Sequence, residues 1–395
     1  MLISEFTRAL EEVVPLAAIG YERDAVGLQV GLPEGTVLKN VLFAYEVTSE
    51  IIAEARERDA NLIVAFHPLI FLNVDSVTDR TRTGRLIREL VKSDVALYVQ
   101  HTAFDSQTEF GTSQLMADVL DLDDIQSLVP LKNSLDKITV FAPYTESKSI
   151  METLIKSGAG KIGNAEGCSF QIEGRSQYKS QEVTSAAGTS VLEGVDEVRL
   201  EMVCERWKTS RAVRAMLESH PHQNVTYDVT ALTTESRNYG MGAIGRWSEA
   251  KSREEVLRLV STAFSVPALR FSDGGSGMIL HVAMVGGAGM EFYGAARLQG
   301  ADAFITADIR YHDFHRASHD HILLIDAGHA ETERFVSHGM VRAARKALEL
   351  SKLNLAFPEE NLLVARMEPN SVRYFCRELR AFASPGGSIA GDAGA

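Results

Sequence analysis

Apolar runs alternate with segments of helical periodicity along the first part of the chain. Three runs are typical of strands buried on both faces: VLKNVLFAYEV (37–47), LIVAF (62–66) and VALYVQH (95–101). Two segments between them repeat their apolar residues at helical spacing: SEIIAEARERDA (49–60), with Thr48 as a candidate N-cap, and TGRLIRELVKSD (83–94). This strand–helix–strand rhythm predicts an α/β domain with parallel pairing.

The pattern changes near residue 130. Strand-like and helix-like segments follow in the order KITVFAP (137–143), METLIKSG (151–158), VRLEMVCER (198–206) and VTYDVTAL (225–232). Two strand–helix–strand passes of this kind predict a small ferredoxin-like α+β domain. After it, ILHVAMVGGAGM (279–290) and DAFITADIRYHD (302–313) restore the earlier rhythm, so we expect the second half to complete the first.

The predicted organisation is therefore a two-part α/β core with mixed sheets flanked by helices, interrupted by one inserted domain. Residues 1–129 form the first half of the core, 130–235 the inserted domain and 236–382 the second half. The Gly-rich end of the chain, 383–395, is predicted to be a disordered tail.

Composition and charge exclude some classes of protein. The chain has 395 residues, an apolar fraction of 45% and a net charge of -13, which argues against a general nucleic-acid binder, since such a protein would need a basic face. Three scattered cysteines indicate a reducing compartment and cannot build a thiolate zinc site. The early acidic residues do not suit a secretory signal, and no apolar run is long enough to cross a membrane, so we expect a cytoplasmic protein.

Histidines follow three of the predicted strands. His67 and His101 come at two strand ends, and His329 follows the apolar run LLID (323–326). Each could be a metal ligand, although a histidine can also simply end a strand. Ligands of open α/β sheets lie at the carboxyl ends of strands, so three imidazoles in this position predict a metal site.

Carboxylates accompany two of these histidines. Glu333 lies four residues after His329, which places both side chains on one face of a helix, and Asp105 lies four residues after His101. The alternative is a solvated helix whose polar side chains only face water. A carboxylate can also bridge two cations about 3.5–4 Å apart.

Two further segments also come at the ends of predicted strands. Thr306, Asp308 and His312 follow another strand and are candidates for orienting the ligands, with a direct role open for Asp308 and His312. The glycines of MVGGAGM (284–290) suit a tight strand-to-helix turn beside the site, or a phosphate at the following helix.

Several separated motifs together resemble one family, the Ngg-interacting-factor-three-like dinuclear metal proteins, often labelled GTP cyclohydrolase I type 2 homologues. The matching motifs are AVGLQVG (25–31), HPLIF (67–71), HTAFDS (101–106), GAGKIGNAEGCSFQIEG (158–174), VTYDV (225–229), GMGAIG (240–245), DAFITADIRYHD (302–313) and DAGHAETE (326–333).

The resemblance implies more than the pattern does. It implies an inserted domain similar to nitrogen-regulatory and divalent-cation-tolerance proteins, and a toroidal hexamer with paired metal ions facing its cavity. By resemblance, the ligands are His67, His101, Asp105, His329 and Glu333, with Glu333 bridging the ions.

One position departs from the family pattern. Phe66 stands where the family usually has the first of two histidines before the proline, and phenylalanine cannot bind a cation. Water or another side chain replaces that imidazole, or one of the two metal sites is weak or empty.

Two functions are compatible with these observations. The first is a metal-dependent hydrolase acting on a nucleotide or phosphoester-type small molecule, with zinc, iron or manganese activating water and His101 or His312 moving protons. The second is a non-enzymatic hexameric protein that binds a metal or ligand in a regulatory or scaffolding role.

Overall fold

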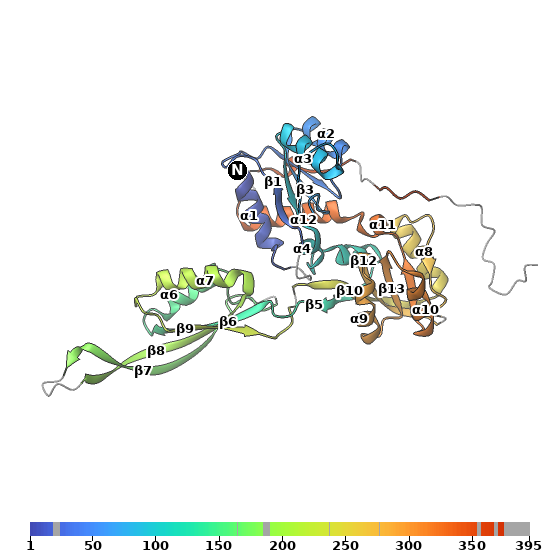
Figure 1. The fold of residues 1–395 in the computed structure, drawn as a ribbon. Helices are drawn as coiled ribbons and strands as arrows, with labels where there is room; N and C mark the ends of the chain where they lie inside the picture. Colours follow the sequence, from blue (N-terminus) through green and yellow to red (C-terminus); the bar gives the residue numbers. More distant parts are fainter. Residues whose placement is uncertain are drawn as a thin grey trace, which may run out of the picture.

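The computed structural model describes residues 1–18, 24–163, 165–184, 190–236, 238–275, 277–353, 357–366 and 370–374. Within them, the chain forms three sheets with helices packed against them (Figure 1). The predicted tail 383–395 lies outside the described residues. None of the described helices is long and apolar enough to cross a membrane.

The first core sheet is mainly parallel and covered on both faces. Its strand order is β1 (Gly27–Val30), β4 (Ala96–Val99), β3 (Ala60–Ala65), β2 (Asn40–Ala44) and β15 (Leu362–Val364), with only β1 antiparallel to its neighbour. One face packs against α1 (Ile3–Val13) and α12 (Val336–Leu350). The other face packs against α2 (Ser49–Glu57) and α3 (Arg82–Lys92). This double burial explains the continuous apolar runs of its strands.

The second core sheet is mixed. Its strand order is β11 (Arg270–Phe271), β14 (Leu323–Asp326), β13 (Ala303–Ala307), β12 (Ile279–Ala288), β10 (Gly240–Lys251) and β5 (Asp123–Pro130). Strands β12, β13 and β14 are parallel, and the other pairs are antiparallel. Helices α5 (Thr112–Val119) and α8 (Arg253–Phe264) cover one face. Helices α9 (Tyr293–Leu298) and α10 (Tyr311–His319) cover the other.

Each core sheet contains segments from both sides of the inserted domain. Strand β5 precedes the inserted domain but pairs with β10 in the second sheet. Helix α12 and strand β15 come from the end of the described chain and return to the first sheet (Figure 1). The second half of the chain therefore completes the first sheet, as the returning rhythm predicted.

The inserted domain has the predicted ferredoxin-like topology. Its elements run in the order β6 (Leu135–Pro143), α6 (Ser147–Lys156), β7 (Phe170–Thr184), β8 (Ser190–Glu205), α7 (Arg206–Ser219) and β9 (Tyr227–Leu232). The strands form one antiparallel sheet in the order β7-β8-β6-β9, with both helices on one face. Strands β7 and β8 project away from both core sheets (Figure 1).

Most local predictions are confirmed, and the largest difference concerns His101. The sequence predicted that strand β4 would continue to His101, but the strand ends at Val99 and His101 begins the short helix α4 (His101–Asp105). His101 has a φ of 33°, a conformation that a residue with a side chain seldom adopts. This sharp turn directs the chain from the sheet edge into the candidate metal centre.

Candidate metal centre

His67 lies just past the carboxyl end of β3. Its backbone N–H donates to the carbonyl of Tyr45, which extends the parallel pairing of β3 with β2 beyond their last strand residues. Pro68 lacks the N–H that would continue the ladder. The imidazole is therefore delivered at the sheet edge, and burial lowers its pKa to about 4, which favours the neutral ring that binds metals.

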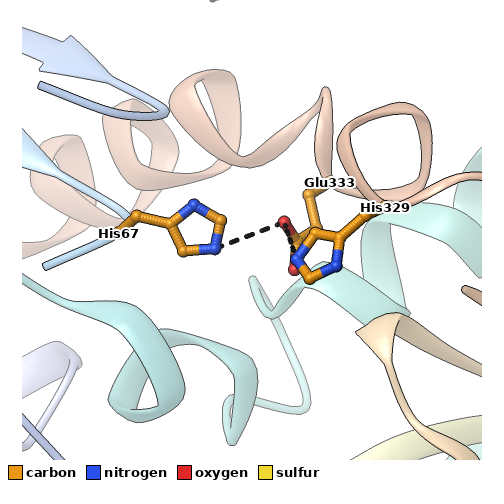
Figure 2. Close-up of side chains that lie close together, drawn as sticks. All are labelled: His67, His329 and Glu333. Carbon is orange, nitrogen blue, oxygen red and sulfur yellow. Dashed lines mark ion pairs between the residues drawn. The ribbon is translucent and has the colours of Figure 1, made fainter. Parts of the chain in front are cut away.

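His329 and Glu333 lie on one face of the short helix α11 (His329–Glu333), one turn apart. The Glu333 Oε2 atom lies 3.2 Å from Nε2 of His329 and 3.5 Å from Nε2 of His67 (Figure 2). The three side chains place their donor atoms within 4.8 Å of one another. Two imidazoles and a carboxylate at this spacing suit a single divalent cation.

Asp308 orients the His329 ring. Its carboxylate lies 2.7 Å from Nδ1 of His329, so Nδ1 carries a proton toward Asp308 and Nε2 faces Glu333. Hydrogen bonding to Glu333 and to Asp308 raises the pKa of His329 to about 9. A carboxylate behind a ligating imidazole is a recurrent arrangement in metal sites, and it matches the orienting role predicted for Asp308.

A second histidine of the same cavity is oriented in the same way. Asp24 lies 2.8 Å from Nδ1 of His101 and accepts a hydrogen bond from the Thr102 N–H. Burial opposes the charge on Asp24, but hydrogen bonds from His101 and Thr102 lower its pKa to about 2. The Nε2 atom of His101 is the ring nitrogen left for a cation or a proton.

Asp105 completes this second group. It accepts a hydrogen bond from the Thr112 hydroxyl, and burial together with the charge of Glu333 raises its pKa to about 7. The ionised form of Asp105 is therefore disfavoured first by burial and then by the nearby charge of Glu333. A cation between these two carboxylates would favour the ionised form instead.

These side chains line one cavity of about 320 Å³. All five predicted ligands contribute to its wall, together with Asp24: His67, His101, Asp105, His329 and Glu333. No lysine or arginine is among the described residues that line it. Three imidazoles and three carboxylates without a basic side chain to balance them fit a divalent metal centre.

Gly287 lets the backbone of β12 approach this centre. A Cβ atom at this position would lie 2.3 Å from Oε1 of Glu333 and 3.0 Å from Nε2 of His329, and the φ of Gly287 is 61°. Its N–H donates to the hydroxyl of Thr332 at 3.0 Å. Gly287 thus lies within β12, where the pairing with β13 shifts register between Met284 and Ala288, and the predicted turn out of the strand comes two residues later, at Gly289.

Comparison with known proteins identifies the family. The sequence profile of the family described as Duf34/NIF3 (NGG1p interacting factor 3) matches residues 1–361. The chain belongs to the NIF3 family. The motif resemblance is thereby confirmed over nearly the whole described chain.

Individual NIF3-family relatives agree with this assignment. A Halalkalibacterium halodurans protein named GTP cyclohydrolase 1 type 2 homolog is 35% identical over 338 residues, covering 85% of this chain and 90% of that protein. A Bacillus subtilis protein of the same name is 31% identical over 328 residues, covering 82% and 87%.

Solved structures of similar proteins share the fold. A Bacillus cereus protein related to NIF3 superposes with a TM-score of 0.81 at 28% identity, over 94% of this chain and 98% of that one. A Staphylococcus aureus protein superposes with a TM-score of 0.70 at 26% identity, over 95% and 99%.

The structure separates the predicted NIF3 site residues into three groups. His67, His329 and Glu333 form the tight group, and His101 and Asp105 line the same cavity beside it. His312 is exposed on α10 and is not among the described residues that line the cavity. Coordination by the first five and proton transfer by His312 stay predictions.

Two residues of the site were missed by the sequence analysis. Asp24 orients His101 from 77 positions earlier in the chain, and the Tyr45 hydroxyl donates to Oε2 of Glu333 at 3.0 Å across 288 positions. The only local signal was their position: Asp24 directly precedes AVGLQVG, and Tyr45 follows the apolar strand β2. Neither position indicates a partner so distant in sequence.

Proposed function

We propose that this chain is a metal-dependent hydrolase of the NIF3 family. The observation that carries the proposal is the convergence of His67, His329 and Glu333 within 4.8 Å, at a cavity without a described lysine or arginine. A divalent ion bound by such ligands lowers the pKa of water toward neutrality and polarises a carbonyl or phosphoryl oxygen. Zinc, iron and manganese all accept mixed nitrogen and oxygen ligands, in a centre of one or two ions.

The side chains of the second group would handle the proton in this reaction. Asp24 holds the Nδ1 atom of His101, so its Nε2 atom can accept a proton from water in the cavity and return it to a leaving group. In a two-ion centre, His101 and Asp105 would instead bind the second cation, with Glu333 between the ions. These two roles of His101 are alternatives. His312 is a candidate proton shuttle from α10.

A nucleotide or another phosphoester is the substrate class that we propose. The relatives are named GTP cyclohydrolase 1 type 2 homologs, which suggests a purine nucleotide. Bound cations would have to supply the positive charge that stabilises a substrate phosphate, because the described lining residues include no lysine or arginine.

Metal content and hydrolysis test the proposal together. Metal-free protein reloaded with zinc or manganese is expected to bind at least one ion per chain and to turn over members of a nucleotide and phosphoester panel. His329→Ala and Glu333→Ala should each weaken metal binding by more than about 100-fold, since losing an outer hydrogen-bond partner alone costs roughly 10–100-fold.

The exposed His319 provides the control, because it lies outside the cavity lining. His319→Ala should keep both metal content and turnover. Full hydrolytic activity of His329→Ala and Glu333→Ala would contradict the metal-hydrolase proposal.

A binding protein without catalytic activity is the second candidate. Phe66 favours it, because this fully buried side chain occupies a position where the family usually has an imidazole. Stoichiometric metal binding by the wild-type protein without turnover on the panel would support this function in place of the first.

We also propose a homohexamer, as the family resemblance implies. Exposed apolar side chains beside the cavity support burial by another copy, since Phe71 and Leu72 are 64% and 77% exposed. Light scattering of the purified chain measures its mass, and a monomer would contradict the proposal.

A further inference from the structure

The loss of an imidazole at position 66 leaves the metal centre short of one donor relative to the family pattern. Phe66 itself does not compensate, because its fully buried phenyl ring carries no donor atom. Its ring packs in the core against Phe104 and beside the rings of His67 and His101. A replacement donor, if the chain has one, must come from another position.

Tyr45 occupies the matching position on the adjacent strand. The register of β2 and β3 pairs Ala44 with Ala65, and the ladder continues because the N–H of His67 donates to the carbonyl of Tyr45. Residues at the same register on neighbouring strands project from the same face of a sheet. The rings of Tyr45 and Phe66 accordingly stack, 6.3 Å apart at an angle of 15°.

The Tyr45 side chain carries a donor oxygen to the group, whereas the Phe66 ring carries none. Its hydroxyl lies 3.0 Å from Oε2 of Glu333, the same oxygen that faces His67 and His329. Its ring meets that of His67 edge-on, with 4.7 Å between centroids. Donor atoms around one zinc-sized ion lie roughly 3 Å apart, because each metal–ligand bond is about 2.0–2.2 Å.

We propose that Tyr45 is a metal ligand of this chain, replacing the imidazole that Phe66 cannot supply. The inference rests on the proposed metal centre and adds a phenol oxygen to the two imidazoles and the carboxylate. The centre then binds a divalent or trivalent cation through His67, His329, Glu333 and Tyr45. When a trivalent ion binds, the proton of the Tyr45 hydroxyl passes to solvent, and the phenolate oxygen bonds to the ion.

Tyr98 offers a matched control for substitution of Tyr45. It is a buried tyrosine of the same sheet, and its hydroxyl donates to Glu11 at 2.8 Å, outside the metal centre. Tyr45→Phe and Tyr98→Phe therefore each remove one phenol oxygen that donates to a glutamate. Only Tyr45→Phe removes it from the candidate ligands.

The test uses the full-length protein, stripped of metal and reloaded separately with zinc and with ferric iron. Zinc affinity is measured by competition with a coloured chelator, and ferric protein by its visible absorption, since phenolate bonded to ferric iron gives a charge-transfer band. Tyr45→Phe should lose the band and weaken zinc binding by more than about 100-fold, beyond the roughly 10–100-fold of an outer hydrogen bond. Tyr98→Phe should keep both.

A double variant tests whether an imidazole at position 66 can replace the phenol oxygen of Tyr45 as a zinc ligand. In the double variant Tyr45→Phe/Phe66→His, the new imidazole should restore zinc affinity without restoring the phenolate band. Circular dichroism of each metal-free variant shows whether it is folded.

The outcomes separate the two proposals. Absence of the band in wild-type ferric protein, or zinc binding by folded Tyr45→Phe within roughly 10–100-fold of wild type, would overturn the Tyr45 assignment and leave it a hydrogen-bond donor to Glu333. A wild-type protein that binds neither zinc nor iron would instead refute the proposed metal centre itself.

Discussion

At the scale of single residues, Gly287 is a position where the candidate metal centre has no room for a side chain. Gly287→Ala would place a methyl group against Glu333 and His329 and force an alanine to a φ of 61°. The backbone conformation alone costs about 1–2 kcal/mol. We therefore expect Gly287→Ala to lose stability and zinc affinity together, as measured by denaturant unfolding and chelator competition.

Gly300 separates these two effects, because it has a φ of 76° with no atom within 4 Å of an added Cβ. Gly300→Ala should lose only the roughly 1–2 kcal/mol of the backbone conformation and keep wild-type zinc affinity. Unchanged zinc affinity in Gly287→Ala would mean that Glu333 and His329 do not hold the ion in the arrangement described.

At the scale of elements, one threonine links the helix of the ligands to the neighbouring strand. The buried hydroxyl of Thr332 on α11 accepts the Gly287 N–H of β12 at 3.0 Å and donates to the His329 carbonyl at 2.8 Å. Thr332→Val keeps the shape but leaves a buried N–H without its partner, which costs about 1–3 kcal/mol. We expect it to lower both the free energy of unfolding and metal affinity.

Thr332→Ser retains the hydroxyl and is the matched comparison for Thr332→Val. It should bind zinc with nearly wild-type affinity. If Thr332→Val kept wild-type zinc affinity and Thr332→Ser lost it, the methyl group and not the hydroxyl bonds would connect α11 to β12.

At the scale of the whole molecule, the inserted domain extends from the tip of a core hairpin. Pro130 of β5 pairs with Gly240 of β10, and the Ser236 N–H donates to the Leu131 carbonyl at 2.8 Å. The two crossings into the inserted domain are thus adjacent. Replacing residues 132–235 by an Asn-Gly turn should leave a folded core, because a two-residue turn can join such strands.

Zinc affinity of the shortened chain should equal that of the full-length protein, because no described residue of β6 to β9 lines the metal cavity. The inserted domain also contacts the core through the ion pair of Arg211 with Glu12 of α1, a surface contact worth about 0–1 kcal/mol. Arg211→Ala removes this contact alone and leaves the inserted domain in place. Loss of zinc binding in a folded shortened chain would show that the inserted domain helps to build the centre.

Much of the architecture was predictable because its signals are local. Apolar runs and helical spacing identified the strands β2, β3 and β4, the helices between them and the ferredoxin-like insertion. Polar residues at strand ends identified His67, His101 and His329 as candidates, because parallel strands deliver their C-terminal neighbours to one edge of a sheet. The exposed position of His312 could not be predicted, since helical spacing does not say which face of α10 meets the cavity.

By itself, the sequence determined most of the elements, the family and five of the side chains that line the cavity, since each has a signal in its neighbouring residues. Only the tertiary structure decided that Asp24 holds His101, that Tyr45 reaches Glu333, and that β5, α12 and β15 exchange between sheets. These contacts join residues far apart in sequence, such as the 288 positions between Tyr45 and Glu333. Such contacts arise from register and packing, which leave no periodic signal along the chain.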